Sequence, residues 1–442
     1  MKNVEQYIKN PEKALRMLAW PIILGMLIQI IYNLTDTAFV GRIGVEALAA
    51  ITFSFPLFFI LMALANLVAS GATALIAQSI GAKKREEACR IATKAIVLSV
   101  FIALGVTIFG LLTLKKGFIL LGAEQKVIEL GILYMAPILA ASIFAFLSST
   151  YSAILNAQGK TKIPAIVRAI SVFLNLGMDY VFIFIFSWGI FGASVATALS
   201  IVFEAIAFFI IIKNYEVTPK FKYWSFDLSL VRKIVFIGGP ASLAQLIMAF
   251  SWTFFNRIFA GFGTEMVAAY GLIGRLDSVL FMPLMGLSIA LMTLVGMFYG
   301  AKEYDLITRL VKSAIKYGLF LAIPLGFLFW AFPELGLRVL TNDPNVISLA
   351  IPLLRVEVFA YPIMVIGFLL GRSLMGLGYG MPSLVITSVR LILVAVPLAW
   401  FFTSVLGYGP RSVILAMVLA GVVSVVIAII WFRVKIMKIK RV

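Results

Sequence analysis

Hydrophobic residues run through this chain in blocks of roughly 20 to 30, each long enough for a helix to cross the hydrocarbon core of a bilayer, with short polar joints between them. A transmembrane β-barrel would instead show segments of roughly ten residues that alternate in polarity, and these blocks do not alternate. The pattern predicts an all-α integral membrane protein with twelve transmembrane helices, at residues 14–40, 47–80, 90–114, 127–156, 163–187, 190–212, 231–260, 265–299, 306–331, 346–376, 381–406 and 410–432.

The second half of the chain repeats the first. FVGRIGVEALAA (39–50) resembles FAGFGTEMVAAY (259–270), IGAKKREEACRI (80–91) resembles YGAKEYDLITRL (299–310), and LNAQGKTKIP (155–164) resembles LMGLGYGMP (374–382). Because six spans are even in number, the halves are parallel repeats related by an axis along the membrane normal. We predict two six-helix lobes around a central cavity: an N-terminal lobe at residues 1–213, a cytoplasmic linker at 214–230 and a C-terminal lobe at 231–442.

Lysine and arginine gather in alternate joints, which sets the orientation by the positive-inside rule. Most of them lie in the N-terminus, in the joints within residues 83–90, 160–168, 213–233, 302–316 and 372–390, and in the C-terminal tail. We therefore expect both termini in the cytoplasm and the protein in the cytoplasmic membrane. The stretch MKNVEQYIKNPEKALRM lacks the apolar core and cleavage site of a signal peptide, so we expect the N-terminus to be retained.

Composition narrows the chemistry. Hydrophobic residues make up 62% of the chain and charged ones 13%, against roughly 25% charged in soluble domains. The net charge of +18 is explained by the cytoplasmic joints and acidic lipid headgroups, so no nucleic-acid partner is expected. With no histidine and a single cysteine, Cys89, the chain cannot form an internal disulfide, a Cys/His zinc site or a histidine-based triad. We expect no cofactor. Any proton or ion chemistry is expected to use carboxylates, hydroxyls and amides.

Polar residues inside the first lobe share one depth. Three spans carry them at helical spacing: Gln29, Tyr32, Asn33 and Asp36 in the first, Arg168, Ser171, Asn175 and Asp179 in the fifth, and Ser194 and Thr197 in the sixth. Counted from the outer helix ends, Asp36, Asp179 and Thr197 differ in depth by no more than about one turn. A charge in the bilayer costs about 2.5 to 3.5 kcal/mol on insertion scales, so these side chains are expected to face protein and to meet in the outer half of the lobe.

Two carboxylates with an amide and a hydroxyl suit either a proton or a sodium ion. Burial and mutual repulsion favour retention of a proton by one carboxylate, and hard oxygen ligands suit a hard monovalent cation. The alternative is that these residues only tie helices together by hydrogen bonds. At the matching positions of the second half, Asn256 replaces Asp36 and Pro397 or Leu398 replaces Asp179, so we expect coupling in the first lobe alone.

Three further charged residues within predicted spans are candidates for a role in transport or pairing. Glu204 follows Thr197 by seven residues on the same face, nearer the cytoplasm, and is a candidate second stop for a proton. Arg275 and Asp277 are two residues apart and share no helical face, so each is expected to pair elsewhere.

A central cavity requires adaptable walls, and 37 phenylalanines and 17 methionines supply such surface. The polar candidates on inward faces are Gln29, Tyr32, Asn33, Tyr134, Ser149, Ser152, Asn156, Gln245, Trp252 and Asn256. Pro21 removes a backbone hydrogen bond within the first span and permits a kink. We predict that protonation of Asp36 or Asp179 changes this bend and expels substrate outward; the alternative is a static kink.

The first span sets Pro21, Tyr32, Asn33, Asp36, Gly41 and Gly44 in a pattern that resembles the opening of the multidrug and toxic compound extrusion (MATE) family. The joints after spans 2 and 8, and NAQGKTKIP after span 4, are similar as well. The resemblance is greatest to DinF-type and archaeal members. It implies a drug:cation antiporter that alternates between inward-open and outward-open lobes.

The same resemblance implies a cation-coupling role for Asp36, Asn175, Asp179 and Thr197, with H⁺ or Na⁺ as the ion. Sodium-coupled NorM-type members carry acids in spans 7 and 10. The corresponding stretches here, ASLAQLIMAFSW and FAYPIMVIGFLL, have none, which weakens the case for NorM-type sodium coupling.

Three functional classes remain for comparison, and an ATP-driven pump is considered in addition. The favoured one is an exporter of amphipathic, often cationic small molecules, working as a monomer among membrane lipids. A lipid-linked oligosaccharide flippase of the same wider superfamily would need several basic residues in its cavity, and few lie mid-membrane here. An intramembrane enzyme would need a nucleophile with a base or a metal site, and an ATP-driven pump would need a G-x-x-x-x-G-K-[ST] motif, which is missing.

Overall fold

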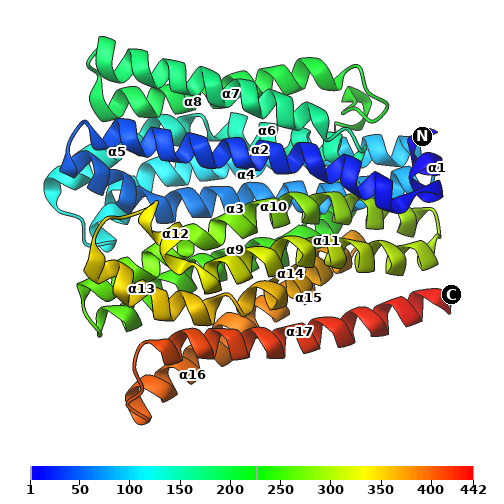
Figure 1. The fold of residues 1–442 in the computed structure, drawn as a ribbon. Coiled ribbons are helices and arrows are strands. Elements are labelled where there is room, and N and C mark those ends of the chain that lie inside the picture. Colours follow the sequence, from blue (N-terminus) through cyan, green and yellow to red (C-terminus); the bar gives the residue numbers. More distant parts are fainter. Residues whose placement is uncertain (1, 225–226, 442) are drawn as a thin grey trace. The chain divides into compact units, whose positions relative to one another are not determined.

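Long helices follow the apolar blocks of the sequence (Figure 1). The computed structural model describes residues 2–224 and 227–441, excluding the side chains of residues 2, 3, 30–34, 36–38 and 45. Within this part of the chain, nine helices are long and apolar enough to cross a membrane, and two bent helix pairs raise the number to eleven. The 31-residue helix Pro11–Gly41 adds a further long element. The predicted all-helical membrane fold is confirmed.

The elements include three π-helical segments, η1, η3 and η4, and one 3₁₀ turn, η2. In chain order they are α1 (Lys2–Lys9), α2 (Pro11–Gly41), α3 (Val45–Gly81), α4 (Arg85–Leu120), α5 (Gln125–Ala140), α6 (Ser142–Ala157), α7 (Lys162–Tyr180), η1 (Val181–Ile185), α8 (Gly189–Ile212), η2 (Phe221–Tyr223), α9 (Leu228–Ala260), α10 (Thr264–Gly300), α11 (Tyr304–Ala331), α12 (Pro333–Arg338), α13 (Pro344–Glu357), α14 (Ala360–Gly376), α15 (Met381–Ser388), η3 (Val389–Ala395), α16 (Val396–Trp400), η4 (Phe401–Val405) and α17 (Arg411–Lys440).

Two of the predicted spans are broken rather than continuous. The span predicted at 127–156 consists of α5 and α6, bent by 50°, and the span at 346–376 consists of α13 and α14, bent by 52°. Pro137 lies in the last turn of α5, and Pro362 lies in the first turn of α14. A proline cannot donate its backbone hydrogen bond to the preceding turn, so each break falls where the helix is already weakened.

The chain forms two compact units. The first contains Trp20–Ser242, and the second contains Lys2–Ala19 together with Leu243–Val442. Helix α2 therefore begins in the second unit and continues in the first, and α9 does the reverse. Each of these helices carries a proline within three residues of the change, Pro21 in α2 and Pro240 in α9.

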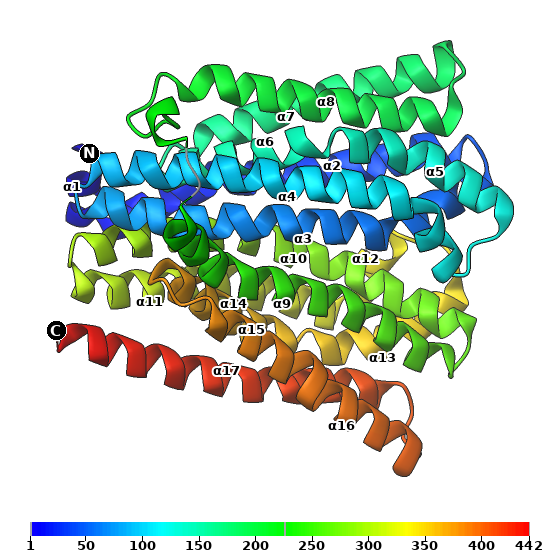
Figure 2. The ribbon, with the colours of Figure 1, turned by 180° about the vertical axis from the view of Figure 1, so that it is seen from behind.

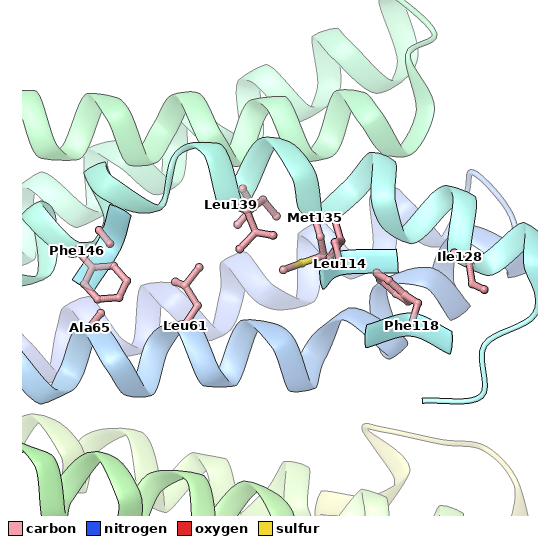
Figure 3. Close-up of a cluster of buried hydrophobic side chains, with 10 residues drawn as sticks. Leu61, Ala65, Leu114, Phe118, Ile128, Met135, Leu139 and Phe146 are labelled. Atoms are coloured by element: carbon pink, nitrogen blue, oxygen red, sulfur yellow. The ribbon is translucent and has the colours of Figure 1, made fainter. Parts of the chain in front are cut away.

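An apolar cluster joins α3, α4, α5 and α6 of the first unit (Figure 3). Phe118, Met135 and Phe146 are fully buried there, with Leu61 and Leu139 beside them. Contact is so close that a Cβ added at Gly131 would lie 2.4 Å from the Phe118 ring. Each large side chain buried in this way contributes about 1.5 to 3 kcal/mol in water, whereas in lipid the close packing itself supplies the attraction.

The helices of the first unit end at two opposite faces. One, here called the linker face, holds residues 81–85, 157–162 and the described part of the linker, 213–224. Gln158 exchanges two 2.9 Å hydrogen bonds there with the backbone of Val217, and Arg85 donates to the Glu216 carbonyl. Figure 2 shows this linker in green, beside the start of α4. The other, the loop face, holds residues 41–45, 120–125 and 186–189. Lys126 and Glu46 form an ion pair there at 2.7 Å.

Helix α10 is the most buried long helix of the second unit, because 67% of the residues in its most apolar 18-residue stretch are buried. Helix α1 packs against it and buries Tyr7. Arg309 of α11 lies 3.5 Å from Glu12 of α2, and Lys440 at the end of α17 pairs with Asp305 of α11. Both chain ends therefore lie at the same end of this unit's helices, as Figures 1 and 2 show.

Candidate functional site

A tight hairpin positions the polar residues of α7 against those of α8. Ser187 and Gly189 both adopt φ of 57°, which reverses the chain within three residues after η1. Trp188 stacks on Phe182 with ring centroids 5.2 Å apart, and a Cβ at Gly192 would lie 2.9 Å from the Phe182 carbonyl. Only glycine permits that approach, so α8 returns closely along α7.

The inner face of α7 buries the two residues predicted to bind the coupling ion. Asp179 is 0% exposed and Asn175 is 2% exposed. Neither polar atom of the Asn175 side chain bonds to a described residue. Buried amides are nearly always hydrogen-bonded, so Asn175 is available to a water, an ion or a side chain outside the described set. The π-helical segment η1 begins two residues after Asp179, and such segments are frequent at functional sites.

Helix α8 faces this pair with hydroxyl groups. Thr197 donates to the Ala193 carbonyl at 3.0 Å, and Ser200 donates to the Thr197 carbonyl at 2.8 Å. Ser171 of α7 crosses the contact and donates to the Ser200 carbonyl at 2.9 Å. Ser194 has a structural role, because its hydroxyl donates to the carbonyls of Leu133 and Phe191. Each hydroxyl that only donates keeps lone pairs that a water or cation can use.

Three predicted residues of the first span, Tyr32, Asn33 and Asp36, have side chains outside the described residues. Their backbone continues the helix α2. Whether their side chains meet Asn175 and Asp179 stays a prediction.

Closer to the linker face, an ion pair joins the same two helices. Arg168 Nε of α7 lies 3.8 Å from Glu204 Oε1 of α8. The Glu204 side chain is 12% exposed and that of Arg168 is 38% exposed. Beyond this long contact, Glu204 Oε1 is buried and has no hydrogen bond to a described residue.

The second unit contains a polar cluster of its own. Tyr361 of α14 is 1% exposed and donates a 2.9 Å hydrogen bond to Asp277 Oδ1 of α10. Glu357, the last residue of α13, lies within electrostatic range of Asp277 and of Arg390 in η3. Asp277 thus pairs with a tyrosine of another helix, while Arg275 lies on the exposed side of α10. Among the described residues, these acids do not form a group of three or more that could hold a metal ion.

The chain matches a known protein-family model. A family model described as MatE matches residues 21–181 and, a second time, residues 240–401. The chain belongs to the MatE family. Both matches fall on the internal repeat, and they confirm the resemblance to MATE transporters. A MatE chain is a multi-pass membrane transporter and not an enzyme. The DinF-type or archaeal branch stays a prediction.

Relatives and solved structures extend the match over the full length. The chain is 27% identical over 411 residues to a probable multidrug resistance protein NorM of Thermotoga maritima, covering 90% of this chain and 86% of that protein. It is 27% identical over 402 residues to a FAD transporter of Shewanella oneidensis, covering 88% and 87%. A multidrug resistance MATE family transporter solved in an outward-facing conformation superposes with a TM-score of 0.95 at 26% identity, covering 100% of this chain and 99% of that one.

The predicted cavity residues of this MatE chain lie in both units. In the first unit, Gln29, Tyr134, Ser149 and Ser152 are partly buried and Asn156 is 9% exposed. In the second unit, Gln245 and Asn256 are partly buried, and Trp252 is exposed and stacks on Tyr270 with ring centroids 4.7 Å apart. Their assignment as cavity walls stays a prediction.

Sequence reasoning missed two features of the MatE fold here. It did not foresee that Tyr361 bonds Asp277, because 84 residues separate them and a single tyrosine in an apolar span carries no local signal. It noted Arg168 and Glu204 separately without pairing them. The signal was available, because Arg168 and Glu204 each begin or end a run of polar residues spaced three or four apart along their helices.

Proposed function

We propose that this MatE chain is a secondary active exporter that expels amphipathic, often cationic organic compounds in exchange for H⁺ or Na⁺. The observation that carries the proposal is the fully buried Asp179 beside Asn175 at the α7–α8 contact. A carboxylate that deep in a membrane protein is costly unless it serves ion binding or pairing. The relative described as a probable multidrug resistance protein supports the substrate class.

The proposed coupling site consists of Asp36, Asn175, Asp179 and Thr197. For a proton, Asp179 or Asp36 is the acceptor and the amide of Asn175 stabilises the neutral acid by hydrogen bonding. For sodium, carboxylate, amide and hydroxyl oxygens supply the hard ligands that the ion prefers. Thr197 keeps lone pairs for this purpose, because its own hydrogen is donated to Ala193.

We further propose that transport alternates access between the two sides of the membrane. The moving parts are an N-terminal lobe, residues 1–213, and a C-terminal lobe, residues 231–442, joined by the linker 214–230. Ion binding changes the bend of α2 at Pro21 and reshapes the first-lobe cavity, which releases substrate outward. The linker face and both termini lie in the cytoplasm, the host membrane is the cytoplasmic membrane, and the working unit is a monomer.

Two other substrate classes belong in the same test. The FAD transporter of Shewanella oneidensis makes a dinucleotide the anionic substrate to compare with cationic dyes. A lipid-linked oligosaccharide is the alternative substrate of the wider superfamily.

Dye efflux from proteoliposomes tests the proposal. Efflux is measured under a pH gradient without sodium, and then under a sodium gradient at equal pH. Wild type is compared with Asp36→Asn, Asp179→Asn and, as the matched control, Asp305→Asn, which makes the same change at a side chain that is 91% exposed. We expect efflux under one gradient, lost in the first two variants and kept in the control.

The outcomes separate the possibilities. Efflux driven by the pH gradient assigns the site to protons, and efflux that needs only sodium assigns it to sodium. If neither gradient drives efflux of any dye or of FAD, the exporter proposal is wrong and the flippase becomes the favoured function. If gradient-driven efflux persists in Asp179→Asn, the coupling site lies elsewhere.

A further inference from the structure

We propose that the contact between α7 and α8 is the route by which a coupling proton leaves Asp179 for the cytoplasm, with Glu204 as its last carrier and Arg168 as the residue that positions that carrier. This inference rests on the proposed export function in its proton-driven form. It gives a role to the part of the contact nearest the linker face, which the ion site itself does not use.

The polar residues of the contact form one column from the ion site toward the linker face. Each helix carries them three or four residues apart, which places them on a single side of that helix. Two contacts fix the register between the helices, one from Ser171 to the Ser200 carbonyl at 2.9 Å and one between Arg168 and Glu204 at 3.8 Å. Eleven residues separate Arg168 from Asp179, so the column spans about 16 Å of the membrane.

The column offers polar atoms to water along its length. Both polar atoms of the Asn175 side chain are buried and have no bond to a described residue. Ser171 and Ser200 donate to backbone carbonyls, so each hydroxyl can still accept a hydrogen bond. Buried groups of this kind hold ordered water in proteins. In the proposed route, alternating waters and hydroxyls connect Asp179 to Glu204.

The ion pair at the inner end is looser than one built for stability. Arg168 approaches Glu204 through Nε at 3.8 Å, whereas a charge-assisted bond between these groups brings N and O to about 2.7 to 2.9 Å. Glu204 Oε1 has no hydrogen bond to a described residue and is therefore open to a proton. The Arg168 side chain is 38% exposed, and in the proposed route its guanidinium contacts water rather than lipid tails. The column thus opens to water at its inner end.

Arg168 is the charged neighbour of Glu204. Among the described residues packed against α8, Arg168 is the charged group placed within 4 Å of Glu204. Helix α6 presents Tyr151, and the charged residues of α5, Lys126 and Glu129, lie at the loop-face end of that helix. The sequence of η1, VFIFI, adds no charge.

The transfer step is balanced without any other reactant. The O–H bond of neutral Asp179 breaks as the adjacent water takes the proton, and the water chain passes a proton on until an O–H bond forms on the Glu204 carboxylate. Glu204 then releases this proton to water at the linker face, beside the Arg168 guanidinium. Asp179 is left as a carboxylate, and Glu204 and Arg168 return to their starting states.

The test compares net export with exchange in proteoliposomes. Net dye efflux under a pH gradient requires proton release in every cycle, whereas exchange of labelled for unlabelled dye at equal pH requires none. The variants are Glu204→Gln, Glu204→Asp, which keeps the carboxylate, and Glu129→Gln, the same change at an exposed glutamate bonded only to Gln125 among the described residues. We expect Glu204→Gln to lower net efflux roughly a hundredfold while exchange stays near wild type. Glu204→Asp should recover much of the efflux, and Glu129→Gln should match wild type.

Each result decides between the two levels of proposal. If wild type is not driven by any gradient, the export function itself is wrong. If wild type is driven by sodium alone, export stands and the proton route is overturned. If pH-driven efflux persists in Glu204→Gln, or if efflux and exchange fall together in both Glu204 variants, Glu204 is structural and the route is overturned while proton-driven export stands.

Discussion

In the second unit, the Tyr361 hydroxyl on α14 donates a 2.9 Å hydrogen bond to Asp277 Oδ1 on α10. The bond joins two helices that pack along much of their length. Hydrogen bonds to charged groups contribute about 1.5 to 3 kcal/mol, and a buried carboxylate that loses its donor bears the cost.

Tyr361→Phe should therefore lower the free energy of unfolding by about 2 kcal/mol. The measurement is the midpoint of thermal unfolding in detergent. Tyr408→Phe makes the same change at a side chain that is 55% exposed and should leave the midpoint unchanged. Equal losses in the two variants would show that the Asp277 bond contributes nothing to stability.

Gly238→Ala should destabilise the first unit by about 3 kcal/mol, the upper end of the usual cost of overpacking. A Cβ at Gly238 would lie 1.8 Å from the Leu67 carbonyl oxygen of α3, so α9 would have to move away. The neighbouring Gly239→Ala is the control, because its Cβ would meet only Val235 at 3.6 Å. Size-exclusion chromatography after heating measures the fraction of folded protein that remains, which should be lower for Gly238→Ala than for Gly239→Ala. Similar behaviour would mean that α3 and α9 do not approach this closely.

Gln158→Leu should release the linker from the linker face. The side chain exchanges two hydrogen bonds with the Val217 backbone, each contributing about 1 kcal/mol. Trypsin should then cleave at Lys220 and Lys222 several times faster than in wild type. Gln125→Leu, at an exposed position on α5, should not change the rate. Cleavage as slow as in that control would show that other contacts hold the linker.

The stability contributed by Asp227 should depend on pH. Backbone hydrogen bonds, chiefly from the Leu230 N–H, together with the charge of Arg90 hold its pKa below the ordinary value of 3.8. A lowered pKa means that the contribution is complete above the ordinary value and is lost as the pH falls through the lower folded value. Asp227 caps the start of α9, so Asp227→Ala should cost about 1 kcal/mol at neutral pH.

Unfolding of wild type and Asp227→Ala, followed from pH 7 downward, measures this dependence. The difference between the two midpoints should shrink below pH 3.8. A difference that stays constant with pH would assign the effect of the variant to lost packing rather than to the carboxylate charge.

Pro21→Ala should slow gradient-driven dye efflux severalfold, because alanine restores the backbone hydrogen bond and stiffens α2. Pro11→Ala is the control, since proline at the first residue of a helix breaks no hydrogen bond. Efflux at the wild-type rate in Pro21→Ala would show that the kink is static.

Local patterns predicted the helices well and their contacts poorly. The lengths of the apolar blocks and the repeat sufficed for the membrane spans, because crossing a bilayer is a one-dimensional requirement. Asn175 and Asp179 could be placed on one face by spacing alone. The breaks near Ala141 and Val358 could not be located, because a proline weakens a helix but does not determine the angle of its bend. The bonds from Gln158 to Val217 and from Tyr361 to Asp277 required the packing of distant helices.

The exchange of helix segments between the two units has a consequence for biosynthesis. The ribosome makes residues 2–19 before residues 20–242, yet they belong to the unit whose other residues follow Ser242. The first unit, by contrast, has all of its residues once Ser242 has been inserted. Contacts between segments so far apart in sequence form late and slowly. Helix α1 must therefore wait until α10, the helix against which it packs, has been synthesised.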